Sequence, residues 1–177
     1  MSVEHLLKNF SWVIPGLLAG CALPSSDQLD ALATMSHPFG TIVNLREEEY
    51  HPDDVAKLAK NGVVVKHIPI RDFAAPTPEQ MQEAAAIIAM PSPRAVLVHC
   101  RAGIGRTGTI LAVMLAMRAQ TDPHLRAAIE AVPDSQSAGI GKTVAYLRRS
   151  RPQALEVEPQ IAAFQAFERT LLLSSCI

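Results

Sequence analysis

One short stretch of the chain combines the residue types that phosphoryl-transfer chemistry needs. It reads His99-Cys100-Arg101-Ala102-Gly103-Ile104-Gly105-Arg106-Thr107-Gly108. The glycines at 103 and 105 let the backbone curl, so that successive amide N–H groups can face one anion. An arginine at the start of the following helix can hold a dianion with two parallel hydrogen bonds. A cysteine beside such amides is stabilised as a thiolate, so the stretch predicts a phosphate-binding loop in which Cys100 is the nucleophile.

The other positions of this loop receive narrower predictions. The phosphate oxygens are expected to bind the backbone of the residues between the cysteine and the second arginine, Arg101, Ala102, Gly103, Ile104 and Gly105. The Thr107 hydroxyl is expected to donate a hydrogen bond to the sulfur, which would ease its departure when the phosphoenzyme breaks down. His99 is expected to brace the loop through its ring nitrogens rather than act as a base. The Arg101 side chain either adds positive charge beside the loop or points to solvent.

Each of these residues has an ordinary structural explanation when it is taken alone. Free cysteines are usually buried and inert, and glycines followed by an arginine can form a simple tight turn. The interval of five residues between Cys100 and Arg106, directly after an apolar strand, favours the chemical role. An interval of four residues would indicate a sulfurtransferase loop instead.

Phosphoryl transfer also needs a proton for the leaving group. Asp72 stands 28 residues before Cys100, in a proline-bounded loop after a β-rich run. We predict that Asp72 is the general acid, although an aspartate in this setting can also simply form the turn. Asp53 and Asp54 are rival acids, but they stand at a predicted helix start, where capping explains them.

Strands alternate with helices up to this loop and then give way to helices alone. Residues 95–99 are almost wholly apolar, as expected of a central strand, and 106–117 are apolar nearly all round, as expected of a buried helix. Further strands are predicted within 12–20, which Pro15-Gly16 divides, and at 41–45 and 63–68. Further helices are predicted at 28–35, 53–60, 77–90, 123–131, 140–150 and 159–173, with 133–139 as a loop. This order predicts an α/β fold with a central, mostly parallel sheet flanked by helices and a helical C-terminal half, in a single domain spanning 1–177.

The composition restricts the classes of partner. The chain has 177 residues, of which 49% are hydrophobic and 19% charged, as in soluble globular proteins. Its net charge of −1 argues against broad binding to nucleic acid or to an anionic membrane. Its three cysteines, Cys21, Cys100 and Cys176, form neither a disulfide framework nor a metal-ligand spacing. With no signal peptide and no apolar run of membrane-spanning length, we expect a monomer of the cytoplasm or nucleus that needs no metal or organic cofactor.

The loop resembles the signature of the cysteine-based protein tyrosine phosphatase superfamily, which is His-Cys, five residues, Arg, then Ser or Thr. The closer resemblance is to the small atypical dual-specificity phosphatases that consist of a catalytic domain alone, and it spans about residues 9–170. Asn9-Phe10-Ser11-Trp12-Val13 resembles the opening segment of that group, and Asp72-Phe73 with Pro76, Pro78 and Gln80 resembles its acid loop. Arg148-Arg149-Ser150-Arg151-Pro152, with Gln160, Phe164 and Phe167, resembles its C-terminal helices.

The resemblance implies the protein tyrosine phosphatase-like fold and a two-step, in-line displacement. Cys100 attacks phosphorus while Asp72 protonates the departing oxygen, and Asp72 then activates water against the thiophosphate. It also implies that Gln160 positions this water, although a polar residue on an amphipathic helix explains Gln160 equally well. Residues 121–136 form a longer stretch than such enzymes usually have, which leaves the surface there undetermined.

Three further side chains are open to interpretation. Trp12 and Phe73 either flank the pocket entrance or pack, and for Trp12 packing is favoured. The arginine run that includes Arg151 is interpreted as a solvated face, although in this family such arginines can lie near the pocket rim.

Three functions are compatible with these residues. The first is a protein phosphatase for phosphotyrosine, and for phosphoserine or phosphothreonine because the chain lacks the segments that deepen the pocket of larger tyrosine-specific enzymes. The second is a phosphatase for a non-protein ester such as a phosphoinositide or an RNA 5′-phosphate. Phosphoinositide enzymes of this superfamily tend to carry a second basic residue where this chain has Ile104. The third is a non-catalytic phosphoprotein-binding module, which the presence of Cys100, Arg106 and Asp72 disfavours.

Overall fold

Five strands form the sheet that carries the cysteine loop. The computed structural model describes residues 3–36, 38–90 and 94–174. The strands are β1 (Ser11–Ile14), β2 (Leu18–Cys21), β3 (Phe39–Asn44), β4 (Val64–His67) and β5 (Ala95–His99). Their order across the sheet is β1-β2-β5-β3-β4. β1 runs antiparallel to β2 and the other neighbours are parallel, so the prediction of a mostly parallel sheet is confirmed.

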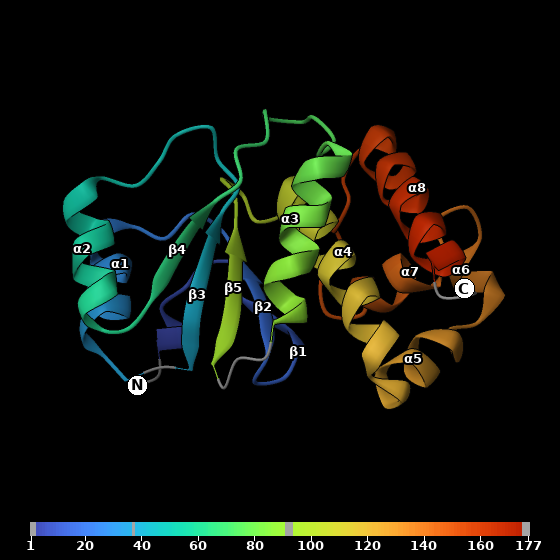
Figure 1. Cartoon of the computed structure of the whole chain (residues 1–177), viewed down its shortest axis with the longest axis horizontal. Helices are drawn as coiled ribbons and strands as arrows, with labels where there is room; N and C mark the ends of the chain where they lie inside the picture. Colours follow the sequence, from blue (N-terminus) through green and yellow to red (C-terminus); the bar gives the residue numbers. More distant parts are fainter. Residues whose placement is uncertain (1–2, 37, 91–93, 175–177) are drawn as a thin grey trace.

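Helices cover both faces of this sheet (Figure 1). A short 3-10 helix, Val3–His5, precedes β1, and α1 (Ser26–Thr34) and α2 (Pro52–Lys60) pack together on one face. On the other face lie α3 (Pro78–Ala89) and α4 (Gly105–Thr121). Beyond α4 come α5 (Pro123–Glu130), α6 (Asp134–Ser137), α7 (Lys142–Arg148) and α8 (Glu158–Ser174). The predicted α/β fold with a helical C-terminal half is confirmed.

Two apolar clusters fill the space between the layers. One joins α1 and α2 to the sheet and includes Leu32, Phe39 and Leu58. The other joins α3, α4 and the C-terminal helices to the opposite face. β5 contributes to both clusters because alternate residues of a strand point to opposite faces, which is why all five of its residues are buried.

α4 is the central helix of the C-terminal half. Its side chains are buried nearly all round because the sheet contacts one side while α3, α5, α7 and α8 contact the others. The helix continues past its predicted end at Met117 as far as Thr121, because polar residues such as Arg118 do not stop a helix and the next proline comes at position 123. Asp122 then caps α5, where its carboxylate accepts a hydrogen bond from the Leu125 N–H at 3.0 Å.

Two further predictions differ from the structure. The loop expected at 133–139 contains the single turn of α6, which the Ala138 N–H closes on the Asp134 carbonyl at 3.0 Å. β3 begins at Phe39 rather than at Thr41, because Phe39 pairs with Ala95 of β5 and is fully buried. In the described part of the chain, no helix combines the length and the hydropathy that crossing a bilayer requires.

Candidate active site

The cysteine loop leaves the carboxyl end of β5 and enters α4, so the sulfur lies near the N-terminus of the most buried helix. Cys100 is almost fully buried, and the Gly103 N–H donates a hydrogen bond to its Sγ at 3.3 Å. Gly103 has a φ of +75°, and a Cβ placed on it would lie 2.4 Å from the Cys21 carbonyl oxygen. Both facts require glycine at this position. The loop therefore lies directly against the end of β2 at this glycine.

The loop carbonyls point away from the sulfur. Each of four consecutive carbonyls meets a donor from outside the loop. His99 Nδ1 lies 3.1 Å from the Cys100 oxygen, and the Leu23 N–H donates to the Arg101 oxygen at 3.0 Å. Asn9 Nδ2 donates to the Ala102 oxygen at 2.9 Å, and Arg151 donates to the Gly103 oxygen. In a planar peptide the C=O and the following N–H point in opposite directions. Outward carbonyls therefore turn the loop amides inward, as an anion site requires.

His99 lies behind the loop as the bracing residue that the sequence predicts. Its Nδ1 can only donate to the Cys100 carbonyl, so its Nε2 accepts the hydrogen bond from the Tyr50 hydroxyl at 2.6 Å. Burial lowers the pKa of His99 to about 4, which keeps the ring neutral. A neutral ring with one donor and one acceptor satisfies both neighbours.

Arg106 and Asp72 are brought together across the mouth of the site. Arg106 Nη2 lies 2.7 Å from Asp72 Oδ1, and Arg106 Nη1 donates to the Ile70 carbonyl at 2.9 Å. The Arg106 side chain is buried, whereas that of Asp72 is 47% exposed. The residue predicted to bind phosphate and the residue predicted to be the general acid are therefore in direct contact.

A cavity of about 340 Å³ opens above the sulfur. Its walls include most of the residues predicted for catalysis and phosphate binding, namely Asp72, Cys100, Arg101, Ala102, Ile104, Gly105, Arg106 and Gln160. Gly103 and Thr107, which were also predicted, do not line it. Phe73 also lines it and is 65% exposed, in keeping with a place at the entrance. Trp12 instead stacks on Phe39, with ring centroids 5.5 Å apart, so packing is its role.

A second cavity of about 350 Å³ adjoins the first and shares Asp72, Arg101 and Arg106 with it. The exposed Arg101 side chain therefore stands beside both cavities, which favours the first of the two interpretations given to it. Arg46 and Glu48 complete the second cavity and form an ion pair of 2.7 Å.

Gln160 connects the acid loop with the start of α8. Its side chain is buried, donates to the Ala74 carbonyl at 3.3 Å and accepts from the Glu156 N–H at 3.1 Å. A Cβ on Gly105 would lie 2.9 Å from the Gln160 amide, so these two residues touch directly. Gln160 therefore lies at the site, whereas the sequence alone was equally compatible with a polar position on the surface of an amphipathic helix.

The hydrogen bond predicted from Thr107 to the sulfur is not formed in this structure. The Thr107 Oγ1 is buried without a hydrogen-bond partner. Its methyl group faces β2, where it would lie 3.2 Å from a Cβ on Gly20. This orientation of the side chain leaves the hydroxyl without an acceptor.

The interpretation of the arginine run as a solvated face is wrong for Arg151. Arg149 is exposed and lies over the Tyr146 ring, and Arg148 bonds the nearby Ala154 carbonyl. Arg151 is only 6% exposed and reaches the cysteine loop. Its partners lie in the N-terminal strands and the loop, far away in the sequence, so no local pattern marks it.

Two more residues at the site were not predicted. Asn9 has a φ of +49° and places its amide on the loop carbonyls, and Glu156 lines the main cavity. Asparagine adopts a positive φ more often than most residues, but this preference does not reveal what its side chain contacts. Among the described residues, no three His, Cys, Asp or Glu side chains are grouped so as to hold a metal ion.

Comparison with known proteins agrees with this geometry. The family model described as "PTP-SAK: Swiss Army Knife protein, DSP-PTPase phosphatase domain" matches residues 7–163. The PRL-1 phosphatase of Drosophila melanogaster is 28% identical over 119 residues, which cover 64% of this chain and 64% of that protein. The tyrosine-protein phosphatase cdc-14 of Caenorhabditis elegans is 28% identical over 116 residues, which cover 59% of this chain and 16% of that protein. The chain thus matches less than two thirds of the length of either relative.

Solved structures share the fold. A crystal structure of Tk-PTP in a mutant form is 30% identical, with a TM-score of 0.70 over 93% of this chain and 97% of that one. The crystal structure of PTPMT1 in complex with PI(5)P has a TM-score of 0.69 over 94% of this chain and 98% of that one, at 16% identity. The second likeness shows the fold alone. The prediction of a protein tyrosine phosphatase-like fold is confirmed.

Proposed function

The chain belongs to the Swiss Army Knife family of DSP-PTPase phosphatase domains, and on this premise we propose that it hydrolyses phosphotyrosine in proteins, and phosphoserine and phosphothreonine where its pocket admits them. One observation carries the proposal. The Cys100 sulfur, the Arg106 guanidinium and the Asp72 carboxylate meet in one cavity, with the Gly103 amide directed at the sulfur. A nucleophile, an anion clamp and an acid are the parts that phosphomonoester hydrolysis needs.

In the first step the Cys100 thiolate attacks phosphorus. The phosphate oxygens are held by the inward loop amides and by Arg106, whose planar guanidinium can give two parallel hydrogen bonds. The dianion competes with Asp72 for Arg106, so substrate binding frees the Asp72 carboxyl to face the leaving oxygen. The P–O bond breaks, the leaving oxygen takes the proton of Asp72, and a cysteinyl phosphate remains.

In the second step water replaces the sulfur. The Asp72 carboxylate takes a proton from water while the water oxygen bonds phosphorus, and the P–S bond breaks to release inorganic phosphate and the thiolate. Gln160 lies against Gly105 and contacts the acid loop at Ala74, so its amide is available to orient this water. Thr107 can serve the departing sulfur only if its hydroxyl turns toward Sγ. The reaction needs no metal or organic cofactor.

The charges around the cavity support a protein substrate over an inositol phosphate. Ile104 offers no positive charge in the middle of the loop, so Arg101 is the residue that adds to the charge of Arg106 there. Glu156 lines the same cavity and opposes the charge of Arg101, so a further phosphate group would meet its carboxylate. In the adjoining cavity the positive charge of Arg46 is balanced by Glu48. PTPMT1, whose structure holds PI(5)P, supports a phosphoinositide only through a shared fold.

Phosphate release from matched substrates tests this proposal. Peptides of one sequence carrying phosphotyrosine, phosphoserine or phosphothreonine are compared with vesicles that contain PI(5)P. We expect the phosphotyrosine peptide to give the highest kcat/KM. Faster release from the lipid would replace the protein substrate with a phosphoinositide, and no release from any peptide would reject the proposal.

The Cys100→Ser variant separates an enzyme from a binding module. The weaker hydroxyl nucleophile should abolish turnover, while the loop amides and Arg106 still bind the phosphopeptide. Equal phosphate release by the variant and the wild-type chain would contradict the nucleophile assignment.

A further inference from the structure

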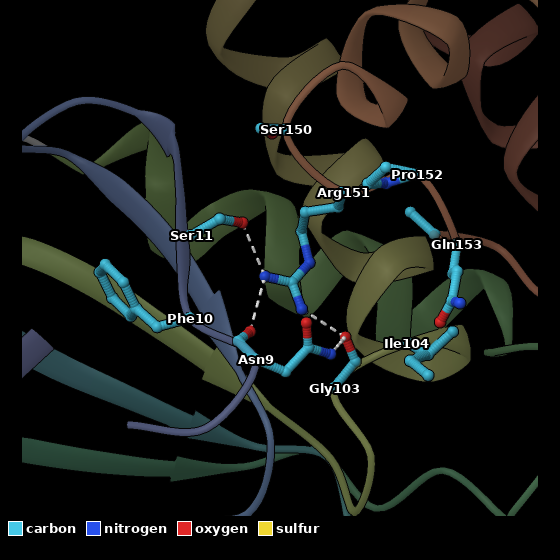
Figure 2. Close-up of a pocket in the computed structure, with 10 residues that line it drawn as sticks. Asn9, Phe10, Ser11, Gly103, Ile104, Ser150, Arg151, Pro152 and Gln153 are labelled. Carbon is cyan, nitrogen blue, oxygen red and sulfur yellow. Dashed lines mark hydrogen bonds between the residues drawn. The ribbon is translucent and has the colours of Figure 1, made fainter. Parts of the chain in front are cut away.

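A buried arginine stands behind the cysteine loop without an acidic partner. Arg151 follows α7, and its guanidinium points between the N-terminal segment and the loop (Figure 2). Among the described residues, no carboxylate forms an ion pair with it, although it is almost fully buried. Burying a charge is costly unless it is paired or fully hydrogen-bonded. The position therefore calls for an explanation.

The guanidinium joins three separate segments. Its Nη1 donates to the Asn9 carbonyl at 3.1 Å and to Ser11 Oγ at 2.8 Å (Figure 2). The same nitrogen donates to the Gly20 carbonyl at 3.0 Å. Its Nη2 donates to the carbonyl of Gly103 in the loop. One side chain thus fixes the loop to the segment before β1, to β1 and to β2.

The contact with Gly103 bears on the anion site. Asn9 Nδ2 donates to the same carbonyl at 3.3 Å, so two donors pull this oxygen away from the sulfur (Figure 2). The Ile104 N–H belongs to the same peptide unit and is directed the opposite way, toward the site. Gly103 is the residue of the loop that can most easily rotate its backbone, because glycine has few steric limits. Without the two donors, the carbonyl could turn toward the phosphate and repel it.

The charge of Arg151 also acts on the sulfur. Burial lowers the pKa of Arg151, while the thiolates of Cys21 and Cys100 would raise it, so the guanidinium and these sulfurs interact. Burial raises the pKa of Cys21 to about 12, so Cys21 stays neutral at pH 7. Of the two sulfurs, Cys100 is therefore the one whose anion could face the buried guanidinium.

We propose that Arg151, assisted by Asn9, is a positioning residue that holds the Gly103 carbonyl outside the anion site and favours the thiolate of Cys100. This rests on the proposed function, in which Cys100 attacks phosphate. Other titratable or charged groups also surround the sulfur, and they stay unchanged in the test: Asp72, Arg101, Arg106 and Glu156 around the cavity, with Tyr50, His99 and Cys21 behind the loop.

Two substitutions of Arg151 separate charge from geometry. Arg151→Met removes both, and Arg151→Lys keeps the charge without the planar fork. Arg149→Met is the matched control, because Arg149 is exposed and, within the described part of the chain, its guanidinium lies over the Tyr146 ring and away from the cysteine loop. Equilibrium unfolding in urea identifies which variants are folded.

The first readout is alkylation of Cys100 by iodoacetamide against pH, followed by mass spectrometry of the peptide that contains it. In Arg151→Met the midpoint should move up by about one pH unit, because a nearby positive charge is lost. In Arg151→Lys the midpoint should stay closer to that of the wild type. The second readout is turnover of p-nitrophenyl phosphate, for which kcat should fall about 10- to 100-fold in both variants because the loop amides lose their alignment.

The outcomes decide the proposal in every case. A folded Arg151→Met variant in which either the alkylation midpoint or kcat equals that of the wild type would reject the proposal. An alkylation midpoint of Arg151→Lys no closer to the wild type than that of Arg151→Met would reject the role of charge. If neither Arg151 variant folds, Asn9→Gly decides, because glycine accepts the φ of +49° and removes the second donor to Gly103. Its kcat should fall below that of the wild type, and an unchanged kcat would reject the proposal. Alkylation needs no substrate, so a shifted midpoint in a chain that hydrolyses no phosphoester would reject the proposed function while supporting the role of Arg151.

Discussion

The ion pair between Asp72 and Arg106 joins the residue proposed as the general acid to the residue proposed to bind phosphate. The carboxylate lies 2.7 Å from the guanidinium that is proposed to hold phosphate. Substrate binding and placement of the acid are therefore coupled, because a phosphate and Asp72 compete for the same donors. At the residue scale, the account depends on Asp72 acting as an acid and on His99 remaining neutral behind the loop.

Asp72→Asn should lower kcat for a phosphotyrosine peptide by about 100-fold, because general acid catalysis contributes 10²- to 10⁴-fold and the amide cannot supply the proton. The loss should be much smaller for p-nitrophenyl phosphate, whose leaving group needs no proton. Asp53→Asn is the matched control, since Asp53 lies in the exposed first turn of α2. Full activity of Asp72→Asn on the peptide would show that another group is the acid.

The free energy of unfolding should decrease as the pH is lowered from about 6.5 to about 4, because of His99. The pKa of this ring is about 4 in the folded chain, against 6.5 as its ordinary value, so the unfolded chain binds more protons in this range. The contribution of His99 to the free energy of unfolding is therefore fully present above pH 6.5. Its loss on acidification to pH 4 amounts to about 3 kcal/mol. Urea unfolding at pH 7, 5.5 and 4 should show this loss in the wild type and a smaller one in His99→Gln. Parallel losses in the two proteins would mean that His99 is not buried neutral.

At the scale of elements, the site lies where β2 and the segment after α7 meet the loop between β5 and α4. The strand, the loop and the helix that carry Cys100 and Arg106 could be predicted, because an apolar run and a glycine-rich turn are local patterns. The order β2-β5-β3 and the burial of Arg151 could not, because both depend on contacts between segments that are distant in sequence. The same limit explains why Asn9 and Glu156 were not predicted. The end of α4 has a local cause instead, because Arg118 ends the apolar pattern of the helix without ending the helix itself.

Gly103→Ala should test the contact between β2 and the loop. A methyl group there meets the Cys21 backbone at 2.4 Å, and the φ of +75° adds strain. Gly16→Ala is the control, because Gly16 has a similar φ of +72° with open space around it. We expect a loss of about 1 kcal/mol in the free energy of unfolding for Gly16→Ala, and about 2 to 3 kcal/mol more for Gly103→Ala. Equal losses of stability in the two variants would show that the contact with β2 does not exclude a side chain at Gly103.

At the scale of the whole molecule, one sheet separates two apolar clusters that share β5. The prediction of a single domain implies that these clusters unfold together, since a residue on either face supports the same central strand. The chain offers a probe for this, because its only tryptophan, Trp12, packs on Phe39 in the cluster of α1 and α2.

Phe164→Ala removes a fully buried side chain of α8 from the opposite cluster. It should lower the free energy of unfolding by about 3 to 5 kcal/mol. If the chain is one domain, the Trp12 fluorescence transition in urea should shift by as much as the far-UV circular dichroism transition. Leu173→Ala, at a side chain that is 72% exposed, should change stability by less than about 0.5 kcal/mol. An unchanged Trp12 transition in Phe164→Ala would divide the chain into two folding units.

The central claim is that phosphate passes through the sulfur of Cys100, and it can be measured on the protein itself. A reaction with a phosphotyrosine peptide is quenched in acid during turnover, and the peptide that contains Cys100 is analysed by mass spectrometry. We predict a phosphoryl group on Cys100 in the wild-type chain and none in Cys100→Ser. The group should be enriched in Asp72→Asn when p-nitrophenyl phosphate replaces the peptide, because this leaving group needs no proton and the variant then slows chiefly the second step. Product formation with the phosphoryl group on another residue, or on none, would contradict the account.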